Sequence, residues 1–316
     1  MSVYTEAEHA IALTDTLYWI DHPPITPVQR YLFGRYHYRL KDFNTAFHWF
    51  TLSLSDGVEQ AWFDIGECLR LDLVDADIWA DFLSGYQENS GCNNISDAKI
   101  TELCYKNAWN YYSNENTENS YLPKGESLFR RGFLLRHGLG TPAVPDTAYQ
   151  LFSDVVRLHA SLTPDDFNIC CDYSNAGTSD GGTHISSPVG LCKLPAGAAL
   201  FEMAMYHSKN EQRRFLKQAY DFHFEEALFY DYEHCGKAYE DYEYQDDIRE
   251  LFSFRIGQYT RVHDVNPSPK SLDRLACMYE NGYPGDNEER RQAFAMKAAP
   301  LRKKITVMKA ATEKLL

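Results

Sequence analysis

The 316-residue sequence lacks the features that identify many membrane proteins and enzymes. It has no apolar run of about 18 residues, the length that a membrane-spanning helix needs. The motifs HExxH, GxGxxG and GxxxxGK followed by Ser or Thr are all absent. These motifs identify zinc proteases and nucleotide-binding loops. The GxSxG pattern of α/β-hydrolases occurs once, as GTSDG from Gly177 to Gly181, but it lacks the preceding strand that this motif requires. We therefore expect no membrane insertion and none of these three kinds of active site.

Positive charge is scarce as well. The chain has 31 Lys and Arg residues against 45 Asp and Glu residues, which gives a formal net charge of -14 at pH 7. A protein that binds nucleic acid through its phosphates needs a concentrated basic surface. We therefore expect no nucleic acid among the partners, and we expect another protein with a basic surface instead.

The N-terminus and the cysteines bear on the cellular compartment. The first fifteen residues have no basic region followed by an apolar one, and they carry Glu6, Glu8 and Asp15, which argues against a secretory leader. The eight cysteines lie at irregular positions without a CxxC pair, which favours reduced thiols over a disulfide framework. We expect a cytoplasmic protein, or a secreted or periplasmic one if a leader has been removed.

A short pattern recurs at equal intervals along the chain. It has a small residue, a middle residue four positions later, Gly or Ala next to it, and a final residue three positions further on. The copies are Ser127, Arg131, Gly132 and Leu135; Ala199, Met203, Ala204 and His207; and Ser271, Leu275, Ala276 and Tyr279. They begin at 127, 199 and 271, each 72 residues after the last, or twice 36. A repeat of this length is typical of an α-solenoid built from helix pairs.

The central Gly or Ala of each copy predicts where two antiparallel helices approach closely, because a larger side chain there would push them apart. Including two weaker copies, the predicted packing positions are Gly34, Gly66, Gly132, Ala204 and Ala276. Glycines that follow the copies predict helix ends with positive φ, and an Asp near each of them predicts the next helix start.

These residues carry a family resemblance. The stretch LFRRGFLLRHGLGTPAVPDTAYQLF, from Leu128 to Phe152, resembles the Sel-1-like repeat, a relative of the tetratricopeptide repeat with a longer turn that contains glycine. The stretch from Ser271 to Phe294 is similar to a second copy, and residues 29–53 are closer to a plain tetratricopeptide unit. The resemblance implies an all-α, right-handed solenoid of about seven antiparallel helix pairs. Such repeats serve as adaptors or scaffolds without chemistry of their own.

The chain divides into three predicted regions. Residues 1–160 are N-terminal helical repeats, residues 161–197 are a long loop rich in Gly and Ser, and residues 198–316 are C-terminal repeats with a terminal capping helix. The basic residues near the end indicate a final helix with one face in water, and salt-sensitive association with the acidic region of a second copy is the alternative. These residues are Arg290, Arg291, Lys297, Arg302, Lys303 and Lys304.

Two sets of residues are candidates for binding a partner protein. Residues 220–251 are crowded with acids and tyrosines, which enrich at interfaces and steer a basic partner. From this region we select Asp231, Tyr232, Tyr239, Tyr242 and Asp246. The alternative is a solvated helical face whose tyrosines pack between repeats. On the inner surface formed by the first helix of each pair we select Tyr36, Asp64, Glu67 and Arg130.

Three patterns suggest chemistry, but each has a simpler structural explanation. Ser96 and Lys99 form an SxxK pair, although Ser96 precedes an apolar-periodic run and fits a helix N-cap better. Asp75 and Asp77 fit a helix start. The loop residues Cys170, Cys171, His184 and Cys192 lack the spacing of a zinc site. We therefore predict no catalytic residue, metal or cofactor.

The sequence favours a non-enzymatic scaffold or adaptor that binds a partner protein on the inner surface of the solenoid, as a monomer or a weak homo-oligomer. Two other hypotheses stay open. One is a tight-binding inhibitor, such as an immunity protein that plugs the active site of a toxin with the acidic tyrosine region. The other is an enzyme that uses the 161–197 loop.

Overall fold

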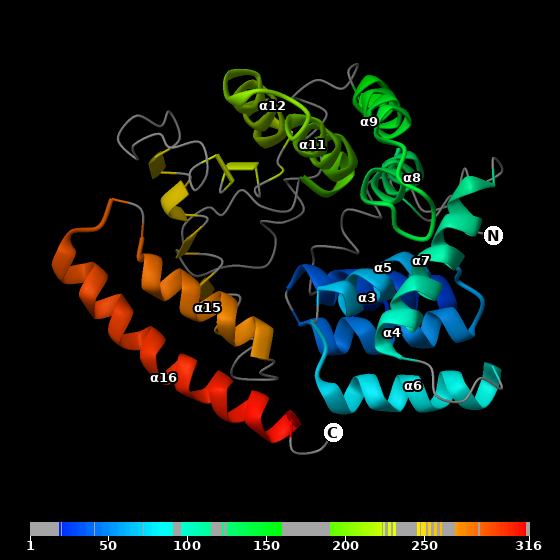
Figure 1. The fold of residues 1–316 in the computed structure, drawn as a ribbon, viewed down its shortest axis with the longest axis horizontal. Helices are drawn as coiled ribbons and strands as arrows, with labels where there is room; N and C mark the ends of the chain where they lie inside the picture. The colour runs from blue at the N-terminus through cyan, green and yellow to red at the C-terminus, as the bar shows by residue number, and fades with distance from the viewer. Residues whose placement is uncertain are drawn as a thin grey trace. The chain divides into compact units, whose positions relative to one another are not determined.

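The computed structural model describes most of the chain between residues 19 and 313. The described residues are 19, 21–40, 42–71, 73–90, 96–114, 122, 125–159, 190–222, 269–283 and 285–313, with scattered positions from 224 to 260. Their regular elements are all α-helices, which confirms the expected all-α class (Figure 1). Within these residues no helix is both long and apolar enough to cross a bilayer.

The described residues fall into two compact units. The first takes residues from Met1–Tyr36, Trp49–Gly66 and Ser96–Gly236, and the second takes residues from His37–His48, Glu67–Ile95 and Lys237–Leu316. The N-terminal helices are α3 (Pro27–Arg39), α4 (Phe43–Ser55), α5 (Ala61–Arg70), α6 (Ala76–Ser90) and α7 (Asp97–Ser113). They are followed by α8 (Glu126–His137), α9 (Pro145–His159), α11 (Gly190–Ala204), α12 (Lys209–Asp221), α15 (Pro269–Asn281) and α16 (Glu288–Glu313).

Helix α8 and helix α9 form a close pair in the first unit. A Cβ atom added at Gly132 in α8 would lie 2.8 Å from the ring of Phe152 in α9, so only the missing side chain lets the two helices come this near. Phe152 is completely buried there, and removing such a ring from water contributes about 1.5–3 kcal/mol. The small residue of the repeat therefore faces a bulky residue of the second helix.

The turn between α8 and α9 depends on two glycines. Gly138 ends α8 with a φ of 65°, and its N–H donates to the carbonyl of Leu134. Gly140 has a φ of 68°, and a Cβ atom there would lie 2.3 Å from the backbone of Tyr105 in α7. A positive φ and a close approach thus both require glycine at this position. The predicted positive-φ helix end is confirmed.

One apolar core connects four helices of the first unit. The buried residues Leu135, Ala148, Val155, Leu200, Met203, Ala204 and Leu216 belong to it, together with Phe152. Helix α9 contributes to this core between α8 on one side and α11 on the other. Each helix therefore buries its apolar face against its neighbours along the chain, as stacked helix pairs do.

The end of the predicted 161–197 loop needs correction, because α11 begins at Gly190 and runs through the last part of that range. Pro195 lies inside this helix, where it removes one backbone hydrogen bond. The buried residues Ala196, Ala199 and Leu200 pack into the core just beyond it, and this packing favours the helix. Residues 160–189, the rest of the loop, lie outside the described residues.

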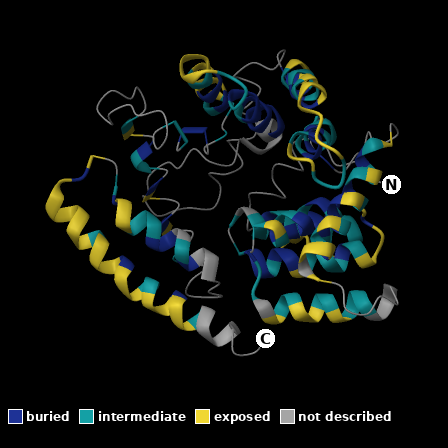
Figure 2. Ribbon diagram, in the orientation of Figure 1, coloured by how far each residue is buried: buried dark blue, intermediate teal, exposed yellow. Residues whose placement is uncertain are grey.

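In the second unit, α15 and α16 form a helix pair. Ala276 in α15 is completely buried, and the ring of Tyr279 stacks on Phe294 of α16 with centroids 5.8 Å apart. Farther along α16, Ala298 and Ile305 are buried. Figure 2 shows exposed residues along most of the remaining length of α16.

Candidate functional site

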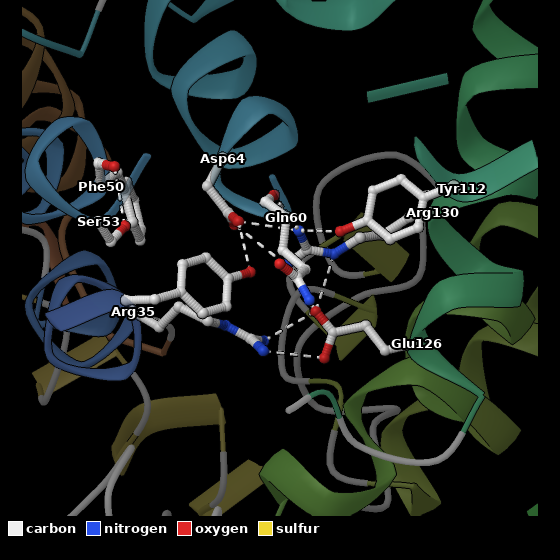
Figure 3. Close-up of polar contacts among 9 residues, drawn as sticks. Arg35, Phe50, Ser53, Gln60, Asp64, Tyr112, Glu126 and Arg130 are labelled. Atoms are coloured by element: carbon white, nitrogen blue, oxygen red, sulfur yellow. Dashed lines mark hydrogen bonds and ion pairs between the residues drawn. The ribbon is translucent and has the colours of Figure 1, made fainter. Parts of the chain in front are cut away.

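The most densely connected polar group of the first unit is centred on Arg130 of α8, which is only 3% exposed. Its Nη1 donates to Oδ2 of Asp64 at 2.8 Å, and its Nη2 donates to Oδ1 at 3.1 Å. Its Nε and Nη2 donate to Oε1 of Glu126 at 2.9 and 2.6 Å. Nη1 also reaches the hydroxyl of Tyr112 at 3.0 Å and the carbonyl of Gln60 at 3.4 Å. Figure 3 shows this guanidinium between its partners.

Helix α3 adds two further side chains to the group. Arg35 donates from Nη1 to Oε2 of Glu126 at 3.0 Å, and its Nη2 lies 3.0 Å from Oε1. The hydroxyl of Tyr31 donates to Oδ2 of Asp64 at 2.7 Å. We call these six side chains the arginine network: Tyr31, Arg35, Asp64, Tyr112, Glu126 and Arg130. Its two guanidinium groups and two carboxylates balance in charge, and its members come from α3, α5, α7 and α8.

Two aromatic rings lie against the guanidinium of Arg130. Its central carbon is 4.6 Å from the centroid of Phe63 and 5.7 Å from that of Tyr112. A guanidinium over a ring face gains cation–π attraction, more so when water is excluded. The rings therefore favour the charged arginine in a site where burial alone would disfavour it.

The electrostatics of the arginine network keep its charges in place. Burial raises the pKa of Glu126, but Arg35 and Arg130 lower it more, so that the net pKa lies below its ordinary value. Burial raises the pKa of the Tyr112 hydroxyl well above its ordinary value, and Asp64 and Glu126 add to that effect. Burial likewise raises the pKa of Tyr31. Glu126 therefore stays ionised, and both tyrosines stay protonated, so that the Tyr31 hydroxyl can donate to Asp64.

The hydrogen bonds of Arg130 limit what the network can do chemically. Each of its three guanidinium nitrogens donates to protein acceptors, and both oxygens of each carboxylate receive donors. A ligand would have to displace one of these buried ion pairs, and breaking such a pair costs about 3–5 kcal/mol. The geometry therefore suits a network that fixes the register of four helices rather than one that receives a substrate.

Of the inner-surface residues expected from the sequence, Tyr36 and Arg130 require correction. They are 5% and 3% exposed, so they do not form an exposed surface. The ring of Tyr36 stacks against Phe33, with centroids 5.9 Å apart, while Arg130 is enclosed by its partners. Asp64 and Arg130 are brought together, but as an ion pair. Glu67 is half-buried and receives Arg70 of the next helical turn at 2.7 Å.

The acidic tyrosine region is only partly described. Asp231 is half-buried and accepts from Nε and Nη2 of Arg213 at 2.9 and 3.2 Å, so its charge is paired within the chain. Asp246 is exposed. Tyr232, Tyr239 and Tyr242 lie outside the described residues. A docking role for this region therefore stays a prediction.

The predicted packing positions are all buried. Gly132 faces Phe152, and Gly66 of α5 faces Tyr105 of α7, whose ring would lie 3.0 Å from an added Cβ atom. Gly34, Ala204 and Ala276 are the remaining buried positions. The missing side chain at Gly66 therefore lets α7 pack closely against α5.

The patterns that suggested chemistry have structural partners where they are described. Ser96 is the N-cap of α7, and its hydroxyl accepts from the N–H of Lys99 at 3.4 Å, which confirms the predicted cap. Asp75 precedes α6 and exchanges two hydrogen bonds with Asn44, at 2.6 and 3.0 Å. Burial raises the pKa of Asp75, and the bond from Asn44 opposes that effect.

The thiols and candidate metal ligands are described only in part. Cys68 and Cys104 are buried and Cys277 is half-buried. Cys170, Cys171 and His184 lie outside the described residues, as does the side chain of Cys192. In the ranges that the structure does cover, no group of three ligand side chains is placed to hold a metal ion.

A second polar cluster links α9 to the start of α12. The hydroxyl of Tyr149 lies 3.2 Å from Nε2 of His207, and Nδ1 of His207 lies 3.2 Å from a carboxylate oxygen of Glu211. The two ring nitrogens of His207 therefore face different partners, Nδ1 the carboxylate and Nε2 the tyrosine hydroxyl. The imidazole stacks on Phe215, with centroids 4.5 Å apart. The cluster orients His207 and joins three segments of the stack.

Sequence reasoning did not select Tyr31, Arg35, Tyr112 and Glu126 as members of a common group. One signal was readable, since Glu126 and Arg130 are four residues apart in a helix and such pairs meet on one face. The pairing of Arg35 with Glu126 spans 91 positions and left no local pattern. Comparison with known proteins adds nothing to this, because no family model and no curated protein matches the chain.

Proposed function

We propose that this protein is a non-enzymatic scaffold that binds a partner protein along a solenoid of helix pairs. In this proposal the array is right-handed, of the Sel-1-like kind, and contains about seven pairs. The protein acts in the cytoplasm as a monomer or a weak homo-oligomer.

The observation that carries the proposal is the continuous core of the first unit. Helix α9 buries its apolar residues between α8 and α11, and the same core extends to α12. In an array of this kind, each helix pair buries its apolar faces against its neighbours, and long polar faces stay at the surface. On α12 the exposed residues are Lys209, Asn210, Glu211, Arg214, Lys217, Gln218 and Asp221. Exposed faces of this sort are the binding surfaces of solenoid proteins.

The arginine network supports the same proposal. It fixes α3, α5, α7 and α8 in register through buried ion pairs, and a binding surface built on these helices is therefore held rigid before a partner arrives. Such preorganisation lowers the entropy cost of association. Within the acidic tyrosine region, exposed Asp246 is the described residue best placed to attract a basic partner.

The experiment is cross-linking of the full chain in extracts of its source, followed by binding measurements with each purified partner. We expect Tyr239→Ala with Tyr242→Ala, and separately Asp246→Lys, to weaken binding about tenfold without changing the melting temperature. Asp81→Lys reverses another exposed acid, on α6, and should leave the affinity unchanged. Equal affinities for all variants would overturn the predicted contact region.

The measured affinity separates the scaffold from the tight-binding inhibitor. A scaffold binds partners with moderate dissociation constants, about micromolar to nanomolar, whereas an inhibitor holds a single partner near picomolar strength. A single partner enzyme bound at picomolar strength, with its activity abolished, would contradict the scaffold proposal.

A further inference from the structure

Helix α16 differs in charge from the chain that carries it. Between Glu289 and Glu313 it has no acidic residue, whereas the whole chain has a net charge of -14. The basic residues of that stretch are Arg290, Arg291, Lys297, Arg302, Lys303, Lys304 and Lys309. This part of the helix is therefore positively charged, although the chain as a whole is negatively charged.

The two faces of α16 have separate roles. Phe294, Ala298, Leu301 and Ile305 recur at helical spacing, and Ala298 and Ile305 are buried. Leu301 and Phe294 pack against residues of α15 and the turn that follows it. This side of α16 is buried in the helix pair, and the opposite side faces solvent.

The opposite face carries two large apolar side chains in water. Met296 is 72% exposed and Val307 is 62% exposed. They are eleven residues apart, which places them about 16 Å apart along the axis and within about 20° of each other around it. Pro300 and Lys303 lie between them on the same exposed face. Exposed apolar residues aligned in this way mark a contact surface more strongly than scattered ones do.

Two lysines on this face are not neutralised by their surroundings. Among the residues that the structure describes, Lys303 and Lys304 have no ion-pair or hydrogen-bond partner, and both are exposed. Their neighbour Arg302, in contrast, is held by Asp273 and Glu280 of α15. We call Met296, Pro300, Lys303, Lys304 and Val307 the basic stripe.

We propose that the basic stripe binds an acidic segment of a partner protein, one that carries apolar side chains among its carboxylates. Apolar anchors of this segment cover Met296 and Val307, while carboxylates lie opposite Lys303 and Lys304. A partner helix meets both requirements, because its positions i, i+4, i+7 and i+11 form one line along its surface. This line is as long as the one from Met296 to Val307. This partner differs in charge from the basic one proposed for Asp246, so the two proposals stand or fall separately.

The residues favour a protein partner over a membrane or a nucleic acid. A helix that lies in a membrane interface buries a continuous apolar face, but the continuous apolar face of α16 is packed in the helix pair. Nucleic-acid affinity grows with the number of phosphates neutralised, and the stripe offers two unpaired lysines. An acidic peptide with apolar anchors uses both features of the stripe.

The test uses the full chain and a synthetic helical peptide with glutamates on one face and leucines spaced as the anchors require. Fluorescence anisotropy should show saturable binding that weakens when salt is raised. Lys303→Glu with Lys304→Glu should weaken it at least about tenfold, and Met296→Ser with Val307→Ser about fivefold. Lys106→Glu with Lys209→Glu makes the same change of charge at exposed positions of α7 and α12, and should leave the affinity within about twofold.

Further measurements make the test decisive. Circular dichroism and melting temperature should be the same for all variants, because the altered side chains project into water. A peptide of the same composition, with its glutamates and leucines shuffled, should bind at least about fivefold more weakly. Equal binding of the two peptides, or equal loss in the Lys106 and Lys209 control, would overturn the proposal. So would binding to phosphatidylserine vesicles or duplex DNA in place of the peptide, or self-association in ultracentrifugation that the Lys303 and Lys304 change abolishes.

Discussion

Two arginines in separate units of this protein make the same kind of contact in opposite surroundings. Arg130 pairs with Asp64 and Glu126 and is 3% exposed. Arg302 pairs with Asp273 and Glu280, and its side chain is 36% exposed. Each guanidinium is held by one Asp and one Glu, and the clearest difference between the two sites is the access of water. The two arginines therefore test how far burial decides what an arginine contributes to stability.

The physical reason lies in what replaces a lost partner. When an exposed ion pair is broken, water solvates both groups, and measured contributions of such pairs are about 0–1 kcal/mol. When a buried pair is broken, the remaining charge is left without a partner and without solvation by water, which destabilises the folded protein. Arg130 also connects residues of several helices, whereas Arg302 connects α15 with α16 alone.

The largest expected effect follows from removing the buried guanidinium. Arg130→Met keeps the length of the side chain but leaves Asp64 and Glu126 with fewer donors, and we expect a loss of about 3–5 kcal/mol in the free energy of unfolding. Arg131→Met is the matched control in the same helix, since its Nε lacks a hydrogen-bond partner among the described residues, and it should cost under about 1 kcal/mol. Urea unfolding measures both. Similar losses for the two variants would show that the buried ion pairs of Arg130 add no particular stability.

The close approach of α8 and α9 gives the next effect. Gly132→Ala places a methyl group 2.8 Å from the buried ring of Phe152, and the shift that this forces should cost about 1–3 kcal/mol. Gly85→Ala in α6 meets nothing within 4 Å, and it should stabilise by about 0.5–1 kcal/mol because alanine favours a helix. Thermal unfolding should therefore shift in opposite directions for the two substitutions. A gain at both positions would show that the helices are not in close contact at Gly132.

Acid should weaken the buried network through Glu126. Its pKa in the folded protein lies below the ordinary value of 4.5, because Arg35 and Arg130 outweigh the effect of burial. A depressed carboxyl pKa contributes stability above the ordinary pKa, and that stability is lost as the pH falls through the folded pKa. Each unit of difference is worth about 1.4 kcal/mol.

Glu126→Gln isolates this effect. The variant should be less stable than the wild type at pH 7, and the difference should shrink as the pH falls below 4.5. Urea unfolding at a series of pH values provides the measurement. A difference that stays constant with pH would remove Glu126 as a source of acid sensitivity.

The smallest effect is expected at the exposed arginine. Arg302→Met should lower the free energy of unfolding by under about 1 kcal/mol, because water replaces Asp273 and Glu280 as its partners. The loss should decrease further in high salt, which screens exposed charges. Calorimetry at low and high ionic strength checks both statements, and a loss as large as that of Arg130 would contradict them.

Local features of the chain could be predicted from its sequence. The serine before α7 and the glycine after α8 act within a few residues of their own position, so the patterns of Ser96 and Gly138 were sufficient. The spacing of small residues likewise indicated Gly132 as a packing position. These predictions depend on propensity and helical periodicity, which a single sequence contains.

The arginine network and the start of α11 could not be predicted in the same way. Arg130 meets Asp64 across 66 positions, and arginine is so seldom buried that a surface position was the natural expectation. Pro195 normally signals a loop, but the core residues that follow it outweigh the one lost hydrogen bond. In both cases tertiary packing decides the outcome, and packing partners far apart in the chain leave no local pattern.

The most direct test of the account is a pair of double-mutant cycles, Arg130→Met with Asp64→Asn, and Arg302→Met with Asp273→Asn. Each cycle measures the coupling energy between one arginine and one carboxylate from the unfolding free energies of four proteins. We predict a coupling above about 2 kcal/mol for the buried pair and below about 1 kcal/mol for the exposed pair. Equal couplings in the two cycles would contradict the claim that burial makes Arg130 the residue that holds its helices in register.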